Sequence, residues 1–129
     1  MSSPVLIIED DDDIRELLIS RIRRLGYRPV AVSSAEAGLE LAAAEVPELV
    51  VLDIRLPGID GWEFLRRLRA APSTAGVPVM VVSIVDIDES ADHLPVDGYI
   101  VKPFRASRID QIARQLLGET GRPTGESKP

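Results

Sequence analysis

Residues 5–18 read VLIIEDDDDIRELL and contain the first unit of the fold. An apolar run leads into five adjacent carboxylates at positions 9–13, and a helical apolar stripe follows. A short continuous apolar run is typical of a strand that is covered on both sheet faces. The last three carboxylates, residues 11–13, suit a helix start, where an Asp cap and the helix dipole stabilise the structure. Glu9 and Asp10 are left over, and their mutual repulsion favours a bound cation.

The alternation of an apolar run and a helical period occurs five times. Strands are expected at residues 4–9, 27–33, 48–53, 77–83 and 97–102. Helical stripes follow four of them, whereas residues 86–94, after the fourth, are polar and only marginally helical. Five such units predict a parallel sheet with helices on both faces.

Pro29 lies inside the second apolar run, which suits an edge strand. The doubly wound strand order 2-1-3-4-5 places that strand at an edge. We therefore predict an α/β, flavodoxin-like fold, a five-stranded parallel sheet in this order flanked by five helices. Gly26 is expected to close the first helix, and Ser33 and Glu36 to form a capping box at the second.

The composition indicates one globular domain. The 129 residues are 45% hydrophobic and 28% charged, with no cysteine and a net charge of −6. The acidic balance argues against direct nucleic-acid binding, and no apolar run approaches the roughly 20 residues of a membrane span. The N-terminus lacks the features of a signal peptide, so we expect a cytoplasmic protein. We expect a domain over residues 1–117 and a flexible C-terminal tail over residues 118–129.

Polar residues follow four of the five strands at their carboxyl ends. They are Glu9 and Asp10, Asp53, Ser83, and Lys102. In open α/β sheets, ligands bind outside these ends, near the point where the strand order reverses. We therefore expect three carboxylates, a hydroxyl and an ammonium to converge in one crevice. The chain has 13 arginines but only two lysines, and the other lysine, Lys128, lies in the expected tail.

These residue types suit phosphoryl chemistry. A hard divalent cation would relieve the repulsion among Glu9, Asp10 and Asp53, and Mg²⁺ suits a site with few carboxylates and several waters. A carboxylate such as Asp53 can act as a nucleophile and form an acyl phosphate. Mg²⁺ and Lys102 would neutralise the phosphoryl oxygens, and Ser83 could donate a hydrogen bond to the new group.

Four segments, read in order, resemble the signature segments of response-regulator receiver domains. They are residues 5–18, LVVLDIRLPGIDGWEFLRRLR (49–69), VPVMVVS (77–83) and GYIVKPF (98–104). The resemblance covers residues 4 to about 117. It implies a phosphoacceptor switch of a two-component system or phosphorelay rather than an enzyme. The phosphoryl donor would be a histidine kinase or a histidine phosphotransfer protein.

The resemblance also implies residue roles. Asp53 would be the phosphoacceptor, Ser83 the switch hydroxyl and Lys102 the family's lysine, followed by a cis bond to proline. Glu9, Asp10 and Asp53 would hold Mg²⁺ together with the main-chain carbonyl of Arg55, and Tyr99 would occupy the aromatic switch position. The surface that changes would be the helix expected after Ser83, the fifth strand and the last helix. The segment from Ser83 to Lys102 is shorter than in many receivers, so that helix is expected to be short.

Two other functions remain open. A degenerate receiver could act as a passive docking module. A Mg²⁺-dependent aspartyl phosphohydrolase of the haloacid dehalogenase type would need a second carboxylate two residues after the nucleophile, where this chain has Arg55. The arginines at positions 15, 21, 23 and 24 are interpreted as a solvated face of the first helix, with docking to an acidic kinase surface as the alternative.

Overall fold

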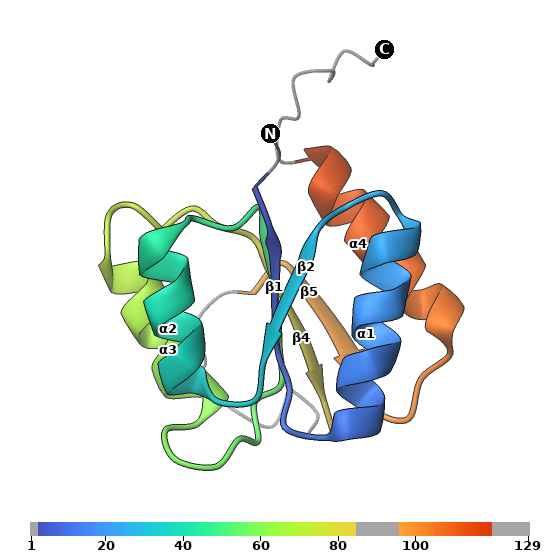
Figure 1. The fold of residues 1–129 in the computed structure, drawn as a ribbon, viewed down its shortest axis with the longest axis horizontal. Helices are drawn as coiled ribbons and strands as arrows, with labels where there is room; N and C mark the ends of the chain where they lie inside the picture. Colours follow the sequence, from blue (N-terminus) through green and yellow to red (C-terminus); the bar gives the residue numbers. More distant parts are fainter. Residues whose placement is uncertain (1–2, 85–95, 120–129) are drawn as a thin grey trace.

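A computed structural model of the chain describes residues 3–84 and 96–119 (Figure 1). The strands are β1 (Val5–Ile8), β2 (Pro29–Val32), β3 (Leu49–Leu52), β4 (Val79–Ser83) and β5 (Gly98–Val101). The helices are α1 (Asp12–Arg24), α2 (Ala35–Ala44), α3 (Gly61–Ala70) and α4 (Ala106–Glu119). Each expected strand is present, with ends at most two residues inside the expected limits.

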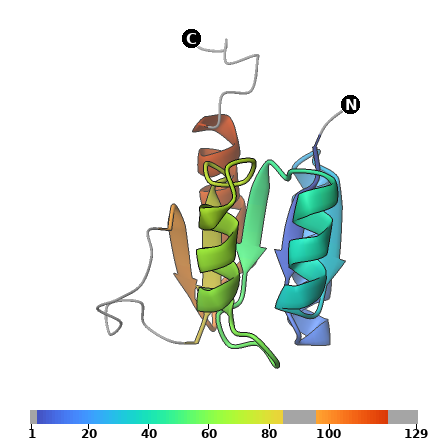
Figure 2. The same cartoon turned by 90° about the vertical axis from the view of Figure 1, so that its left-hand side faces the viewer.

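The five strands form one parallel sheet in the order β2-β1-β3-β4-β5, which confirms the predicted doubly wound fold. Pro29 begins β2 and pairs with Val5 at the edge of the sheet, where a missing N–H is tolerated. All strands run in the same direction, so their carboxyl ends lie along one edge, at the bottom of Figures 1 and 2. The polar residues that follow the strands are therefore brought to that edge.

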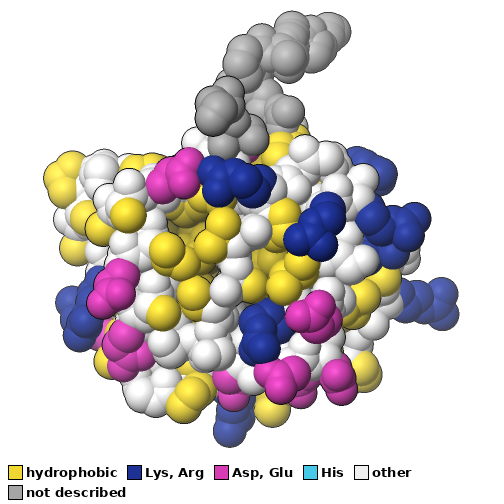
Figure 3. Space-filling model, viewed as in Figure 1, with side chains coloured by type: hydrophobic (Ala, Val, Ile, Leu, Met, Phe, Trp, Pro, Cys, Tyr) yellow, Lys and Arg dark blue, Asp and Glu magenta, His cyan; other side chains and the backbone are white. Residues whose placement is uncertain are grey.

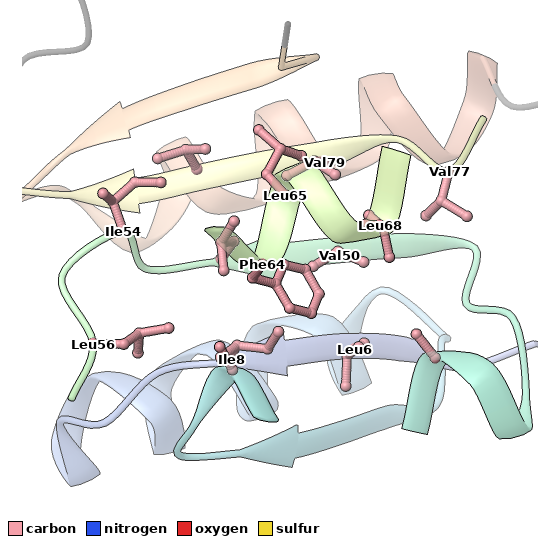
Figure 4. Close-up of a cluster of buried hydrophobic side chains, with 14 residues drawn as sticks. Leu6, Ile8, Val50, Ile54, Leu56, Phe64, Leu65, Leu68, Val77 and Val79 are labelled. Atoms are coloured by element: carbon pink, nitrogen blue, oxygen red, sulfur yellow. The ribbon is translucent and has the colours of Figure 1, made fainter. Parts of the chain in front are cut away.

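Two apolar clusters cover the two faces of the sheet. Helices α2 and α3 pack on one face, where Phe64, Leu65 and Leu68 of α3 lie over Leu6 and Val50 (Figure 4). Helices α1 and α4 pack on the other face through residues such as Leu18, Ile22, Ile109, Ala113 and Leu117. Successive residues of a strand alternate between the clusters, as the pleat requires. Burial on both faces explains why the inner strands β1, β3 and β4 are continuously apolar.

The helix ends confirm two of the predictions made from local sequence and correct a third. The Asp11 side chain accepts a hydrogen bond from the Ile14 N–H at 2.9 Å, which confirms that the later acids of the run start α1. Gly26 follows α1 with φ 94°, a conformation that favours glycine. The capping box at Ser33 is wrong by one residue, because Ser34 caps α2 by accepting from the Ala37 N–H.

The helix expected between β4 and β5 lies outside the described residues, as does most of the expected tail. Helix α4 continues to Glu119, two residues past the expected end of the domain. In the described part of the chain, no helix combines the length and the apolarity needed to cross a membrane.

Candidate functional site

Glu9, Asp10 and Asp53 lie together because β1 and β3 are neighbours in register. Ile8 pairs with Leu52, and the Asp53 N–H donates to the Ile8 carbonyl at 3.0 Å. Ligand oxygens of the three carboxylates lie within 4.8 Å of one another. The strand ends that carry this cluster lie at the lower edge in Figure 1, and Figure 3 shows acidic side chains along that edge.

Lys102 joins the cluster from β5, which lies two strands away from β3. Its Nζ lies 3.2 Å from Asp53 Oδ2 and 3.2 Å from Glu9 Oε2. The side chain is 15% exposed, and the bond to Pro103 is cis, as the resemblance implies. The ammonium thus bridges two carboxylates that would otherwise repel each other.

Burial sets the protonation of these groups. Glu9 is fully buried and Asp53 is 5% exposed, whereas Asp10 is exposed. Burial, followed by the charge of Asp53, raises the pKa of Glu9 to about 7. Burial acts to lower the pKa of Lys102, but the hydrogen bond and charge of Glu9, with the charge of Asp53, outweigh it and raise that pKa. Lys102 is therefore cationic at neutral pH.

The donor set fits a hard divalent cation. Glu9 Oε1 is buried and accepts no hydrogen bond among the described residues, although the Lys102 ammonium lies 3.1 Å away. A buried carboxylate oxygen without such a bond is costly, and a metal ion would satisfy it. All the side-chain ligands are oxygens, and exposed Asp10 leaves room for water, which Mg²⁺ retains in most protein sites.

A family model described as a response regulator receiver domain matches residues 5–114, which include every predicted site residue. The chain belongs to the response-regulator receiver family. It is therefore a receiver domain of the kind found in two-component response regulators, as the four sequence segments implied.

Known proteins resemble this receiver in sequence and fold. The transcriptional regulatory protein AfsQ1 of Streptomyces coelicolor is 35% identical over 95% of this chain and 55% of that protein. A putative response regulator from Chloroflexus aurantiacus has a TM-score of 0.83 at 27% identity, covering 92% of this chain and 100% of that chain. This receiver spans about half the length of the first curated regulators that it matches.

The same fold occurs in the receiver domain of the sensor histidine kinase PA1611 from Pseudomonas aeruginosa. Its structure superposes with a TM-score of 0.83 at 22% identity, covering 92% of this chain and 100% of that chain. A magnesium ion is coordinated in the active site cleft of that protein.

The remaining predicted residues of the receiver lie near the cluster or along β5. Ser83 is buried at the end of β4, and its carbonyl accepts the Lys102 N–H at 2.8 Å. The Arg55 N–H donates to Asp53 Oδ1 at 3.0 Å, which places the Arg55 backbone beside the carboxylate. Tyr99 is half-buried on β5 and packs against the core beneath α2 and α3.

Two of the four arginines of α1 were wrongly interpreted as solvated. Arg21 forms an ion pair with Asp110 of α4, and Arg15 donates from Nη1 to the Glu9 carbonyl at 3.0 Å. Both side chains are only 22% exposed. The sequence did contain a sign of the Arg15 contact. A cation near a helix N-terminus opposes the helix dipole, so its presence there indicates a specific partner nearby.

Proposed function

We propose that this receiver accepts a phosphoryl group on Asp53 from a phosphohistidine and acts as a switch. The observation that carries the proposal is the cluster of Glu9, Asp10 and Asp53 with the Lys102 ammonium between two of them. The domain would extend to the end of α4 at Glu119, and the protein would work in the cytoplasm. The names of its relatives support a transcriptional role for the whole protein.

The transfer needs a nucleophile and compensation of charge. An Asp53 carboxylate oxygen would attack phosphorus, the P–N bond of the phosphohistidine would break, and the imidazole would leave with that electron pair and take up a proton. Lys102, already 3.2 Å from Asp53 Oδ2, would turn to a phosphoryl oxygen. The Arg55 N–H would keep the other carboxylate oxygen oriented.

Mg²⁺ would be held by the carboxylates of Glu9, Asp10 and Asp53, and by the Arg55 main-chain carbonyl. When bound, it would supply positive charge to the oxygens of the transferring group. The buried Glu9 oxygen without a hydrogen bond supports this assignment. So does the magnesium in the cleft of the PA1611 receiver domain, a protein with the same fold.

The response would be a shift between two conformations. The Ser83 hydroxyl, at the end of β4, would bond the new phosphoryl group, and Tyr99 would follow. Both side chains belong to the same sheet face, since Val81 pairs with Tyr99 and side chains alternate along β4. The phosphoryl group biases the equilibrium only as far as it interacts differently with the two states. The output surface would be β5, α4 and the segment before β5.

A mostly apolar pocket beside Lys102 would suit contact with a protein donor. The pocket is lined by Ile14, Leu17, Ile84, Lys102, Pro103 and Phe104. Ile84 is 60% exposed, so this apolar side chain is available for contact with a partner. This pocket supports a histidine kinase or histidine phosphotransfer protein as the donor, because either must bring its phosphohistidine close to Asp53.

Acetyl phosphate with Mg²⁺ tests the proposal in the absence of a partner. The wild-type protein should gain the mass of one phosphoryl group, and Asp53→Ala should gain none. Asp13→Ala removes an exposed carboxylate from the first turn of α1 and should label like the wild type.

Equal labelling of the wild type and Asp53→Ala would reject Asp53 as the acceptor. Absence of labelling in the wild type would favour the passive docking module. Sustained turnover of a phosphomonoester would favour the phosphohydrolase, which the exposed Arg55 at the position of its second acid argues against.

A further inference from the structure

The Glu9 main chain is anchored at both of its polar groups. Its N–H donates to the Val32 carbonyl of β2 at 3.1 Å. Its carbonyl accepts from Arg15 Nη1 at 3.0 Å, six residues further along the chain. The carbonyl therefore has a side-chain partner in place of a sheet partner, at the point where the chain leaves β1 for α1.

Arg15 divides its guanidinium between two acceptors. While Nη1 holds the Glu9 carbonyl, Nη2 lies 2.6 Å from the carboxylate of Asp12, in the first turn of α1. The planar fork of arginine suits two acceptors held at a fixed spacing. It thereby ties the end of β1 to the start of α1.

Asp10 lies between two anchored residues. On one side is the Glu9 carbonyl held by Arg15, and on the other is the Asp11 N–H, which donates to Glu9 Oε2 at 3.1 Å. Asp10 itself is exposed and lacks the packing that orients Glu9 and Asp53. Its direction therefore depends on the peptide planes on either side.

The position of Arg15 runs against simple electrostatics. A cation in the fourth position of a helix opposes the helix dipole. It also adds positive charge 3.0 Å from the Glu9 carbonyl, and Glu9 belongs to the group of three carboxylates that attract a cation. Such a residue weakens cation binding unless it contributes geometry that outweighs the repulsion.

We propose that Arg15 is a positioning residue for Mg²⁺, which orients the Glu9–Asp10 peptide so that both carboxylates face the ion. The proposal rests on the proposed function, because it concerns the same metal site. The positioning role and simple charge repulsion predict opposite changes in Mg²⁺ affinity when Arg15 is replaced. Removing this positive charge should weaken Mg²⁺ binding, whereas repulsion alone requires that binding become tighter.

The test is a titration of ¹⁵N-labelled protein with MgCl₂, followed by NMR at the amides of residues 9–11 and 53. Arg15→Met keeps most of the apolar stem but removes the charge and donors, and should raise the Mg²⁺ dissociation constant by about 10-fold, the lower range for outer-shell partners. Arg15→Lys keeps the charge and one donor but lacks the fork that reaches both the Glu9 carbonyl and Asp12, so it should recover only part of the affinity. Arg23→Met removes an exposed charge from the last turn of the same helix and should leave affinity unchanged or tighter.

A second readout needs no metal. In EDTA, the Asp11 amide should exchange with solvent faster in Arg15→Met than in the wild type. This N–H donates to Glu9 Oε2, and Glu9 is held less firmly once its carbonyl has lost the bond from Arg15. Mg²⁺ binding to Arg15→Met that is as tight as in the wild type, or unchanged exchange at Asp11, would overturn the role of Arg15. A wild-type protein without Mg²⁺-dependent shifts would overturn the metal site itself, and the role of Arg15 with it.

Discussion

The Glu9 carboxyl group carries the highest electrostatic cost of the site. It is fully buried, it lies beside Asp53, and its compensating partners are one ammonium and one backbone N–H. A buried charge is stabilised only when its hydrogen bonds are satisfied, and one Glu9 oxygen accepts none among the described residues. In the absence of metal, the cheapest response is to bind a proton, which explains the raised pKa.

This raised pKa predicts a pH dependence of stability. Without metal, the native state holds the Glu9 proton up to about pH 7, whereas the unfolded chain releases it near pH 4.5. Native protein therefore binds more protons in this window, and its free energy of unfolding should fall as pH rises from about 4.5 to about 7, by on the order of 1–3 kcal/mol. Urea unfolding in EDTA across this range measures the slope.

Glu9→Gln provides the control for that slope. The amide cannot ionise, so the decrease between pH 4.5 and 7 should be largely absent from this variant. An equal slope in the wild type and in Glu9→Gln would show that another group is responsible.

Most of the candidate site could be predicted from residue types and strand ends. Asp53 and Lys102 follow apolar runs that had to be strands, and a parallel sheet brings their ends together. Arg15 could not be assigned in this way, because its partner is a main-chain carbonyl. The pattern of side chains in a sequence does not show which main-chain carbonyl will lack a hydrogen-bond partner in the sheet.

Helices α1 and α4 share one face of the sheet and are linked by a charged contact. The Arg21 Nε donates to Asp110 Oδ1 at 3.0 Å, and a second bond joins Nη2 to Oδ2. This two-point geometry is the favourable arrangement for an arginine and a carboxylate. The hydrogen bond from Arg21 lowers the pKa of Asp110. The contact ties the first helix to the last one across 89 positions of sequence.

The lowered pKa of Asp110 predicts a loss of stability in acid. The contribution is present above the ordinary Asp pKa of 3.8 and is lost as pH falls through the lower native value. Asp110→Asn should lower the unfolding midpoint by about 4 °C at pH 7, and the difference from wild type should shrink as pH falls below 3.8. Thermal unfolding followed by circular dichroism at pH 7 and below pH 3.8 checks this.

A double mutant separates the pair from other effects. Arg21→Met combined with Asp110→Asn should cost little more than either change alone, because each already breaks the same contact. Strictly additive losses would contradict the coupling.

The elements themselves were predictable, but their ends were less so. Apolar runs located all five strands, and those of β1, β3 and β4 are continuous because these strands are buried on both faces. The first strand was expected to reach Glu9 but ends at Ile8, since the Glu9 carbonyl turns to Arg15. The start of α2 was displaced by one residue because Ser33 and Ser34 are equivalent as caps in sequence, and only the backbone decides between them.

At the scale of the whole molecule, the parallel sheet is what gathers like charges at one edge. Repulsion among these charges lowers the stability of the metal-free fold. A ligand that binds only the native state returns stability according to its concentration and affinity. The sheet thus couples metal binding to the stability of the entire domain.

Mg²⁺ should therefore raise the unfolding midpoint. At ten times its dissociation constant, the gain is about 1.4 kcal/mol, or about 6 °C for a domain of this size. Asp10→Asn should lose most of the gain, and Asp13→Asn, in the first turn of α1, should keep it. Differential scanning calorimetry with and without MgCl₂ measures the effect, and an unchanged wild-type midpoint would contradict it.

The burial of Lys102 has a practical consequence for handling the protein. Amine-reactive esters attack only deprotonated amines that they can reach, and this side chain is 15% exposed with a raised pKa. Apart from the amino terminus, the only other amine in the sequence is that of Lys128. Dyes or sensor surfaces coupled through amines at moderate pH would thus attach at the chain ends and leave the pocket open for binding measurements.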